Sequence, residues 1–163
     1  MTKKLIIING TIGVGKTAVC ERLYKELENS IWLEGDWCWK MNPFKVTEEN
    51  KRMVEDNITH LLQNFLQNPN FEYVIFSWII HREFIYNIIL DKLQSLDFEV
   101  IKITLMCSPE ELQRRLKKDK RSDEEITKSL EYLNYYPKMD SIKIDTTGKF
   151  IPEVVEEVLK ILV

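Results

Sequence analysis

A glycine-rich run near the N-terminus constrains the fold more than any other feature of the sequence. Residues 10–17 read GTIGVGKT, which fits the pattern G-x-x-x-x-G-K-[S/T], and they follow the apolar run 4–9 and precede a stretch of helical periodicity. Glycines let successive backbone N–H groups turn inward around an anion, and the start of the next helix adds free N–H groups and the positive end of its dipole. We therefore expect a strand, a phosphate-binding loop and a helix, in this order.

The residues of this loop carry the first functional prediction. Lys16 is expected to reach the β- and γ-phosphates of a nucleoside triphosphate, and the hydroxyl of Thr17 is expected to ligate Mg²⁺. Because a strand precedes the loop and a helix follows it, the motif lies in the context that this chemistry needs. We predict that the nucleotide is bound by Gly10, Thr11, Ile12, Gly13, Val14, Gly15, Lys16, Thr17 and Ala18.

Strand-like and helix-like segments alternate along the rest of the chain. Apolar or β-branched runs occupy 4–9, 31–34, 72–79, 98–106 and 141–145, and helical periodicity occupies about 16–29, 48–67, 82–95, 109–119, 123–135 and the segment from 152. This alternation is typical of a parallel α/β sheet covered by helices on both faces. The length of 163 residues suits one domain, so residues 1–163 are predicted to form a single domain.

Charge and composition favour a small-molecule partner. The net charge of −3 argues against general nucleic-acid binding, which usually shows a basic excess. The N-terminus has no signal-like apolar core and no apolar run approaches membrane-spanning length, so we expect a cytoplasmic protein without membrane contact. Three cysteines without C-x-x-C spacing favour neither a disulfide framework nor a zinc site.

An acidic pair follows the second expected strand. Glu34 and Asp36 are two residues apart, so in an extended chain both side chains point to one face. The carboxyl ends of the strands are where open α/β sheets bind their ligands. One carboxylate could order a water bound to Mg²⁺ while the other accepts a proton from an acceptor hydroxyl, and the sequence leaves open which of the two serves the metal.

Aromatic and basic residues near the same edge are candidates for contact with a second substrate. Trp37 and Trp39 follow Asp36, and their rings could stack on a planar ring or a sugar, or instead close a small core. His81 and Arg82 follow the third expected strand, where an imidazole and a guanidinium could bind a phosphate oxygen or a hydroxyl.

A basic run joins two short helices whose starts carry capping signals. The run extends from Arg114 to Arg121, between the sequences SPEE at 108–111 and SDEE at 122–125. Phosphoryl transfer needs cations that close over the γ-phosphate as charge develops, so we expect Arg115 and Arg121 to act from a short helical lid at about 115–125.

These motifs together resemble the P-loop kinases, the AAA-type small nucleotide kinases that include nucleoside monophosphate, shikimate and gluconate kinases and antibiotic phosphotransferases. The likeness spans nearly the whole chain. Segments 5–17 and 103–116 also look like the ATP-binding tunicamycin-resistance proteins, which have a histidine at the place of His81.

The resemblance implies a P-loop NTPase fold with three α/β/α layers and a five-stranded parallel sheet in the order 2-3-1-4-5. It implies ATP and Mg²⁺ as cofactors, Arg115 near the adenine and phosphates, Arg121 on the transferred group, and the loop around Thr147 and Gly148 against the adenine. Asp36 matches the position that holds the acceptor hydroxyl, within an acceptor-binding region at about 36–70.

The sequence departs from nucleoside monophosphate kinases after the third strand, where it reads SWIIHR at 77–82 in place of an Asp-Gly-Phe/Tyr-Pro-Arg run. The missing acidic residue means that Glu34 or Asp36 must complete the metal shell. We therefore expect an ATP-dependent kinase of an antibiotic, nucleoside-like or sugar-like hydroxyl compound, with Lys16, Asp36 and Arg121 as catalytic residues. The alternatives are a nucleoside monophosphate kinase and a non-kinase ATP-binding switch or ATPase.

Overall fold

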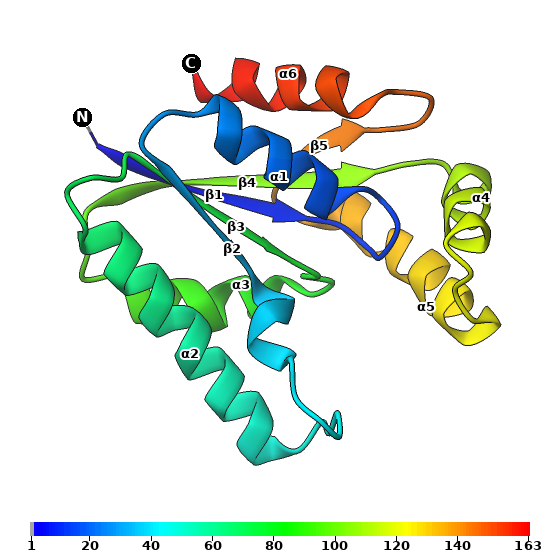
Figure 1. Ribbon diagram of the computed structural model, residues 1–163, viewed down its shortest axis with the longest axis horizontal. Coiled ribbons are helices and arrows are strands. Elements are labelled where there is room, and N and C mark those ends of the chain that lie inside the picture. Colours follow the sequence, from blue (N-terminus) through cyan, green and yellow to red (C-terminus); the bar gives the residue numbers. More distant parts are fainter. Residues whose placement is uncertain (1) are drawn as a thin grey trace.

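Five parallel strands form one sheet in the computed structural model, which describes residues 2–163. The strand order is β2-β3-β1-β4-β5, which confirms the order expected from the resemblance (Figure 1). The strands are β1 (Lys3–Asn9), β2 (Ser30–Glu34), β3 (Tyr73–Trp78), β4 (Phe98–Met106) and β5 (Ile142–Asp145).

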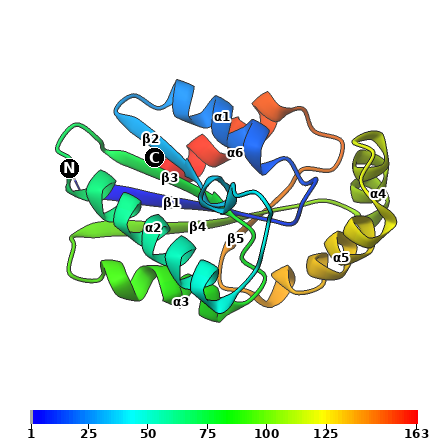
Figure 2. The same cartoon turned by 60° about the horizontal axis from the view of Figure 1, so that its bottom comes forward.

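Helices cover both faces of this sheet. They are α1 (Lys16–Glu26), α2 (Glu48–Gln67), α3 (Glu83–Leu90), α4 (Pro109–Lys118), α5 (Asp123–Leu133) and α6 (Ile151–Leu162). Helices α1 and α6 lie on one face and α2 and α3 on the other, whereas α4 and α5 lie beyond the carboxyl ends of the strands (Figures 1 and 2). Within residues 2–163, no helix combines the length and apolarity needed to cross a membrane.

Three short 3₁₀ helices connect these elements, and two of them correct the sequence prediction. They are η1 (Gly35–Trp39), η2 (Asp91–Leu93) and η3 (Tyr136–Lys138). The helix expected over 82–95 ends at Leu90 and continues as η2, and the segment after Glu34, expected to be extended, turns at once into η1. Asp36 therefore lies in a 3₁₀ turn, where side chains repeat about every three residues. The prediction that Glu34 and Asp36 share a face had assumed an extended chain, where side chains alternate every two residues.

The central position of β1 places the glycine-rich loop at the middle of the carboxyl edge. Residues 5–8 of β1 are at most 1% exposed, because β3 and β4 flank the strand and helices cover both of its faces. The chain crosses from one half of the sheet to the other at this strand, and ligands of open α/β sheets bind at such a switch point. The glycine-rich loop therefore follows directly from a fully buried strand at the centre of the sheet.

Two capped helices bring the basic run to the same edge. The hydroxyl of Ser108 accepts a hydrogen bond from the Glu111 N–H at 3.2 Å, and Ser122 and Glu125 form a full capping box. Both caps were expected from the sequence, and they fix where α4 and α5 begin. The connection between the two helices therefore lies next to the loop that follows β1.

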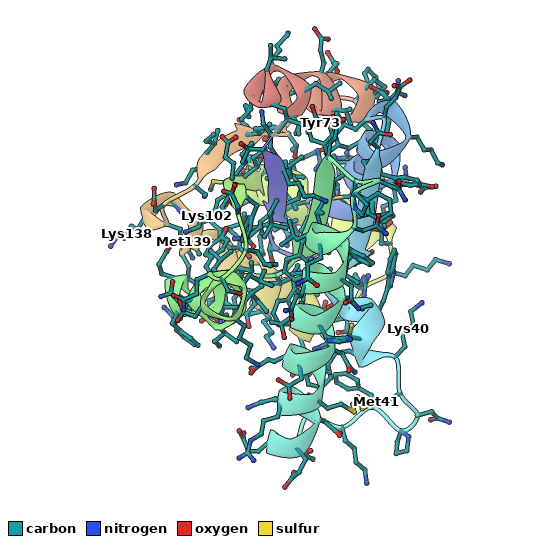
Figure 3. The ribbon with its side chains drawn as sticks, turned by 90° about the vertical axis from the view of Figure 1, so that its left-hand side faces the viewer. Lys40, Met41, Tyr73, Lys102, Lys138 and Met139 are labelled. Carbon is teal, nitrogen blue, oxygen red and sulfur yellow. The ribbon has the colours of Figure 1, made fainter. Side chains whose placement is uncertain are left out.

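The segment after η1 extends away from the sheet with the first turns of α2. Figure 3 shows Lys40 and Met41 beside this end of the helix. The side-chain amide of Asn50 donates to the Lys45 carbonyl at 2.8 Å and contacts the sulfur of Met41 at 3.5 Å. Asn50 of α2 therefore holds this segment at Met41 and Lys45, while the Phe44 ring packs on Trp39 of η1 at a centroid distance of 5.8 Å.

The core that supports the site can be tested with two phenylalanines. Phe76 in β3 is fully buried, whereas Phe84 at the start of α3 is 60% exposed. We expect Phe76→Ala to lower the free energy of unfolding by about 3–5 kcal/mol, because a large cavity opens under the sheet. The matched variant Phe84→Ala should change it by less than about 0.5 kcal/mol. Urea titration measures the free energy of unfolding of both variants. Equal decreases in the two variants would contradict the described core.

Candidate active site

The glycine-rich loop forms a tight turn that only glycine permits at two places. Gly13 has a φ of +87°, and a Cβ there would lie 2.6 Å from the Leu116 side chain of α4. Gly15 has a φ of +105° and is the residue from which α1 starts. A side chain at either position would strain the backbone, so the glycines of the motif are required by this geometry.

Asn9 holds the loop to the neighbouring strand, and the sequence analysis missed it. Its side-chain oxygen accepts hydrogen bonds from the N–H groups of Gly10 and Ile80, each at 2.7 Å, and its amide donates to the Ile80 carbonyl at 2.7 Å. Asn9 is fully buried, so these bonds are protected from water. A polar residue at the end of an apolar strand was the available signal.

Helix α5 holds the same loop from the other side. The hydroxyl of Thr11 donates to the Ser129 carbonyl at 3.0 Å, and the hydroxyl of Ser129 donates to the Ile12 carbonyl at 2.7 Å. Both hydroxyls belong to buried residues. The second helix of the expected lid is thus anchored on the phosphate loop, and Ser129 gave no sequence signal because the pattern of α5 shows it only as a small residue.

Lys16 points back across the loop that precedes it. Its ammonium donates to the Thr11 carbonyl at 3.1 Å. Burial lowers the pKa of Lys16 to about 8, although the nearby carboxylates of Asp36 and Glu34 oppose this shift. The amine therefore stays protonated below about pH 8, and an anion added beside it would raise its pKa again.

Thr17 and Glu34 form the pair that could hold a metal ion. The Thr17 hydroxyl donates to Glu34 Oε1 at 3.1 Å, and Glu34 lies beside Ser77 in the register of β2 and β3. Mg²⁺ prefers oxygen ligands and is usually bound by one or two carboxylates together with substrate phosphates and water. One hydroxyl and one carboxylate at this edge fit that ion, and they would place it against the phosphates of a nucleotide.

A hollow that we call the loop cavity lies over the phosphate loop. Its volume is 360 Å³, and it is lined by loop residues and by Glu34, Asp36, Ile79, Asp119 and Arg121. Arg121 also donates to Glu125 Oε1 at 3.0 Å, so its guanidinium is already paired at this edge. The structure thus brings Lys16, Thr17 and Ala18 together with both acidic candidates and Arg121 around one cavity.

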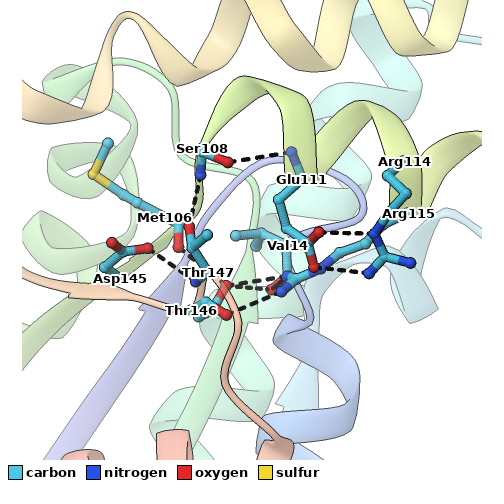
Figure 4. Close-up of polar contacts among 9 residues, drawn as sticks. All are labelled: Val14, Met106, Ser108, Glu111, Arg114, Arg115, Asp145, Thr146 and Thr147. Carbon is cyan, nitrogen blue, oxygen red and sulfur yellow. Dashed lines mark hydrogen bonds and ion pairs between the residues drawn. The ribbon is translucent and has the colours of Figure 1, made fainter.

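Arg115 clamps the loop to the start of the segment that follows β5. Its guanidinium donates to the Val14 carbonyl at 3.2 Å and to the Thr146 carbonyl at 3.0 Å, and its Nε donates to Glu111 at 2.9 Å (Figure 4). Hydrogen bonds from Arg114 and Arg115 lower the pKa of Glu111 to about 2. Arg115 is therefore fixed by four groups, with the Thr146 hydroxyl as the fourth.

Beside this clamp lies a second hollow, the lid cavity, with a volume of 400 Å³. Gly13 and Gly15 line both this cavity and the loop cavity, so the two meet at the phosphate loop. Arg115 and Gly148 line it, whereas Thr147 accepts a hydrogen bond from the Ser108 N–H at 2.8 Å and holds the loop after β5 to α4. The lid cavity therefore opens beside the phosphate loop, next to Arg115 and Gly148.

A third hollow, the aromatic cavity, adjoins the loop cavity on its other side. Its volume is 460 Å³, and Ile12, Asp36 and Ile79 line both. Of the expected acceptor-binding region 36–70, Asp36 and Trp39 line it. His81 and Thr11 also line it, although Thr11 was predicted to bind the nucleotide. The remaining wall comes from residues to which the sequence analysis gave no role in the site: Trp78, Ile85, Glu125, Lys128, Ser129 and Tyr132.

Two predicted substrate-binding residues lie outside this cavity. Trp37 is 43% exposed, and its ring packs on Trp32 at a centroid distance of 4.9 Å. Arg82 lies with its guanidinium 4.0 Å from the ring centroid of Tyr135. Because η1 turns the chain after Asp36, Trp39 faces the cavity and Trp37 faces away from it.

Comparison with known proteins agrees with this geometry. The family model for the AAA domain matches residues 6–135, which include the loop, the acidic pair and both helices beyond the sheet. A search of curated proteins finds no match.

Solved structures with the same fold include three from bacteria. The tunicamycin resistance protein of Deinococcus radiodurans is 20% identical, with a TM-score of 0.69 over 98% of this chain and 95% of that chain. A gluconokinase from Sinorhizobium meliloti is 15% identical, with a TM-score of 0.70 over 98% and 90% of the two chains. The shikimate kinase of Acinetobacter baumannii, in complex with shikimate, is 17% identical, with a TM-score of 0.66 over 99% and 93%. At these identities the likeness shows the fold alone.

The lowered pKa of Lys16 predicts how nucleotide affinity depends on pH. Below pH 8 the free amine is protonated and attracts phosphate, and above pH 8 it loses its charge. Affinity for ATP with Mg²⁺ should therefore fall about tenfold between pH 7 and pH 9, because the protonated fraction of Lys16 falls by about that factor. Calorimetric titration at both values measures this change.

The matched control is Lys16→Arg, whose side chain stays charged throughout this range. Its residual affinity for ATP should be the same at pH 7 and pH 9. A wild-type affinity that is also the same at both values would contradict the role given to Lys16.

Proposed function

The chain belongs to the AAA domain family, and on that premise we propose that it is an ATP- and Mg²⁺-dependent phosphotransferase acting on a hydroxyl of a small molecule. One observation carries the proposal. Asp36 lines both the loop cavity and the aromatic cavity, so a single carboxylate faces the place for the γ-phosphate and the place for an acceptor. The kinases among the solved structures with this fold support the same reaction class.

The nucleotide would span the lid cavity and the loop cavity. Its base and sugar would lie near Arg115 and Gly148, and its phosphates would lie against residues 13–18. The backbone N–H groups at the start of α1 favour an anion there, through their free hydrogens and the helix dipole. Mg²⁺ bound between Thr17, Glu34 and the phosphates would neutralise part of their charge.

Lys16 and Arg121 would stabilise the charge that develops during transfer. Phosphoryl transfer spreads negative charge over the equatorial oxygens, so cations placed around that group lower the barrier. Lys16 reaches the cavity from the loop, and Arg121 reaches it from the connection between α4 and α5. Glu125 keeps Arg121 at the cavity before the nucleotide arrives.

Asp36 would accept the proton of the acceptor hydroxyl. The acceptor would lie in the aromatic cavity, where Trp39, Trp78 and Tyr132 offer ring faces and edges. Lys128 is the cation among the residues that line this cavity, whereas an acceptor phosphate calls for several arginines. A neutral antibiotic, nucleoside-like or sugar-like acceptor suits the cavity better than a nucleoside monophosphate, and the tunicamycin resistance protein with this fold supports an antibiotic among these classes.

The role of Asp36 is tested by Asp36→Asn. This change keeps size and polarity but removes proton acceptance, so phosphorylation of the acceptor should fall by about 10²–10⁴-fold while ATP binding is unchanged. An ADP-release screen over hydroxyl-bearing antibiotics, nucleosides and sugars identifies the acceptor, and single-turnover kinetics with that acceptor measure the loss.

The matched control is Asp97→Asn, which removes the same charge at an exposed position before β4. It should keep the wild-type rate. Wild-type phosphorylation by Asp36→Asn would contradict the proposed base. ATP hydrolysis without transfer to any member of the screen, together with a protein partner bound only in the presence of ATP, would favour a switch.

Arg121 is tested by separating turnover from nucleotide binding. Arg121→Ala should lower turnover roughly a thousandfold or more, because its contact with the transferred group strengthens only as charge develops. Its affinity for ADP should stay at the wild-type value. The control Arg22→Ala removes an exposed arginine of α1 that pairs with Glu26 and should change neither quantity. An equal loss of ADP affinity would make Arg121 a ground-state contact.

A further inference from the structure

An open hollow that we call the outer groove continues the aromatic cavity away from the phosphate loop. It has a volume of 650 Å³ and is lined by His81, Arg82 and residues of α5 and of the turn that follows. His81, Lys128 and Tyr132 line both hollows, so the two meet at these side chains. The proposed reaction assigns nothing to the outer groove.

A pair of stacked rings marks the place where the two hollows meet. The rings of His81 and Tyr132 are nearly parallel, with an angle of 4° and a centroid distance of 4.4 Å. Tyr135 extends the row, 6.1 Å from Tyr132, and the guanidinium of Arg82 lies over its ring. Rigid aromatic surfaces of this kind provide contact area for a ligand ring at low cost in conformational entropy.

The imidazole of His81 also has an unused hydrogen-bonding atom. Its Nδ1 is buried and contacts no polar partner among residues 2–163. Burial and the neighbouring cations of Arg82 and Lys128 lower the pKa of His81, so the ring is neutral at pH 7. A neutral imidazole can pair with a hydroxyl, and buried polar atoms usually have such a partner.

Charges of both signs surround the outer groove. Asp123, Glu124 and Glu131 provide carboxylates, whereas Arg82 and Lys128 provide cations. Both cations lie near tyrosine rings, Arg82 at 4.0 Å from the ring centroid of Tyr135 and Lys128 at 5.7 Å from that of Tyr132. Mixed donors and acceptors next to ring faces suit a neutral ring with several hydroxyls better than a ligand of strong net charge.

We propose that the outer groove is a second acceptor subsite, which binds an uncharged polyhydroxylated ring linked to the part of the acceptor that lies in the aromatic cavity. This inference rests on the proposed function, because it takes the aromatic cavity as the place of the reacting part. The acceptor is then an elongated compound of at least two rings. The aromatic cavity and the outer groove have volumes of 460 and 650 Å³, so together they leave room for a compound that is longer than a single sugar acid.

A series of aryl glycosides tests the length and charge of the site without ATP. Calorimetry on the nucleotide-free protein compares 4-nitrophenyl glucoside, with one sugar, 4-nitrophenyl cellobioside, with two, and 4-nitrophenyl glucuronide, with one charged sugar. We expect the cellobioside to bind at least about tenfold more tightly than the glucoside, because its second sugar reaches the outer groove. The glucuronide carries its charge on the first sugar, so it tests whether the aromatic cavity takes a neutral ring, and it should not bind more tightly than the glucoside.

A variant that fills the groove locates the second sugar. Thr127 is exposed on α5 and lines the outer groove but not the aromatic cavity, so Thr127→Trp should remove the advantage of the cellobioside and leave the glucoside affinity unchanged. The control Gln113→Trp places the same ring at an exposed position on α4 and should keep the full advantage.

Three results would overturn the subsite: equal affinities for the two glycosides, an advantage that survives Thr127→Trp, or no binding by any member of the series. ATP binding by the same preparation separates these results from failure of the proposed function. Loss of the subsite with intact ATP binding rejects this inference alone, whereas absence of ATP binding rejects the nucleotide site itself.

Discussion

The buried side chain of Asn9 is the contact on which the rest of the site depends. Its oxygen accepts from the N–H groups of Gly10 and Ile80, so one atom fixes both the start of the phosphate loop and the chain that leaves β3. The loop provides the expected phosphate site, and the residues on both sides of Ile80, from Trp78 to Arg82, contribute to the aromatic cavity and the outer groove. The proposed phosphate site and the proposed acceptor site are thereby held at a fixed distance by buried hydrogen bonds.

Hydrogen bonds also hold the two helices of the lid, α4 and α5, to the phosphate loop. Arg115 of α4 binds carbonyls of Val14 and Thr146, and Ser129 of α5 binds the loop at Ile12. Arg121 lies on the connection between these two anchored helices and faces the loop cavity. In the proposed reaction, the cation that responds to developing charge would therefore be carried by the short segment between the two anchored helices.

Features that depend on neighbouring residues in the chain could be predicted from the sequence. The alternation of strands and helices, the glycine-rich turn before α1 and the two serine caps follow from periodicity, glycine spacing and capping chemistry, and the structure confirms them. The strand order was expected from the resemblance to P-loop kinases, and the structure confirms it as well. The aromatic cavity could not be found in this way, because Trp78, Glu125 and Tyr132 come together only through the packing of α5 against the end of β3. The turn at η1 likewise separates Trp37 from Trp39, which the sequence had grouped. Roles of Asp36, Arg121 and the other site residues stay predictions.

The most direct test of the account is a crystal structure of the protein with Mg²⁺ and a non-hydrolysable ATP analogue. The account predicts phosphate oxygens within about 2.7–3.2 Å of the backbone N–H groups of residues 13–17, and the metal on the hydroxyl of Thr17. It also predicts that the γ-phosphate points toward Asp36 at the border of the loop cavity and the aromatic cavity. A nucleotide bound elsewhere, or a γ-phosphate directed away from Asp36, would contradict the central claim that this edge of the sheet is a phosphoryl-transfer site.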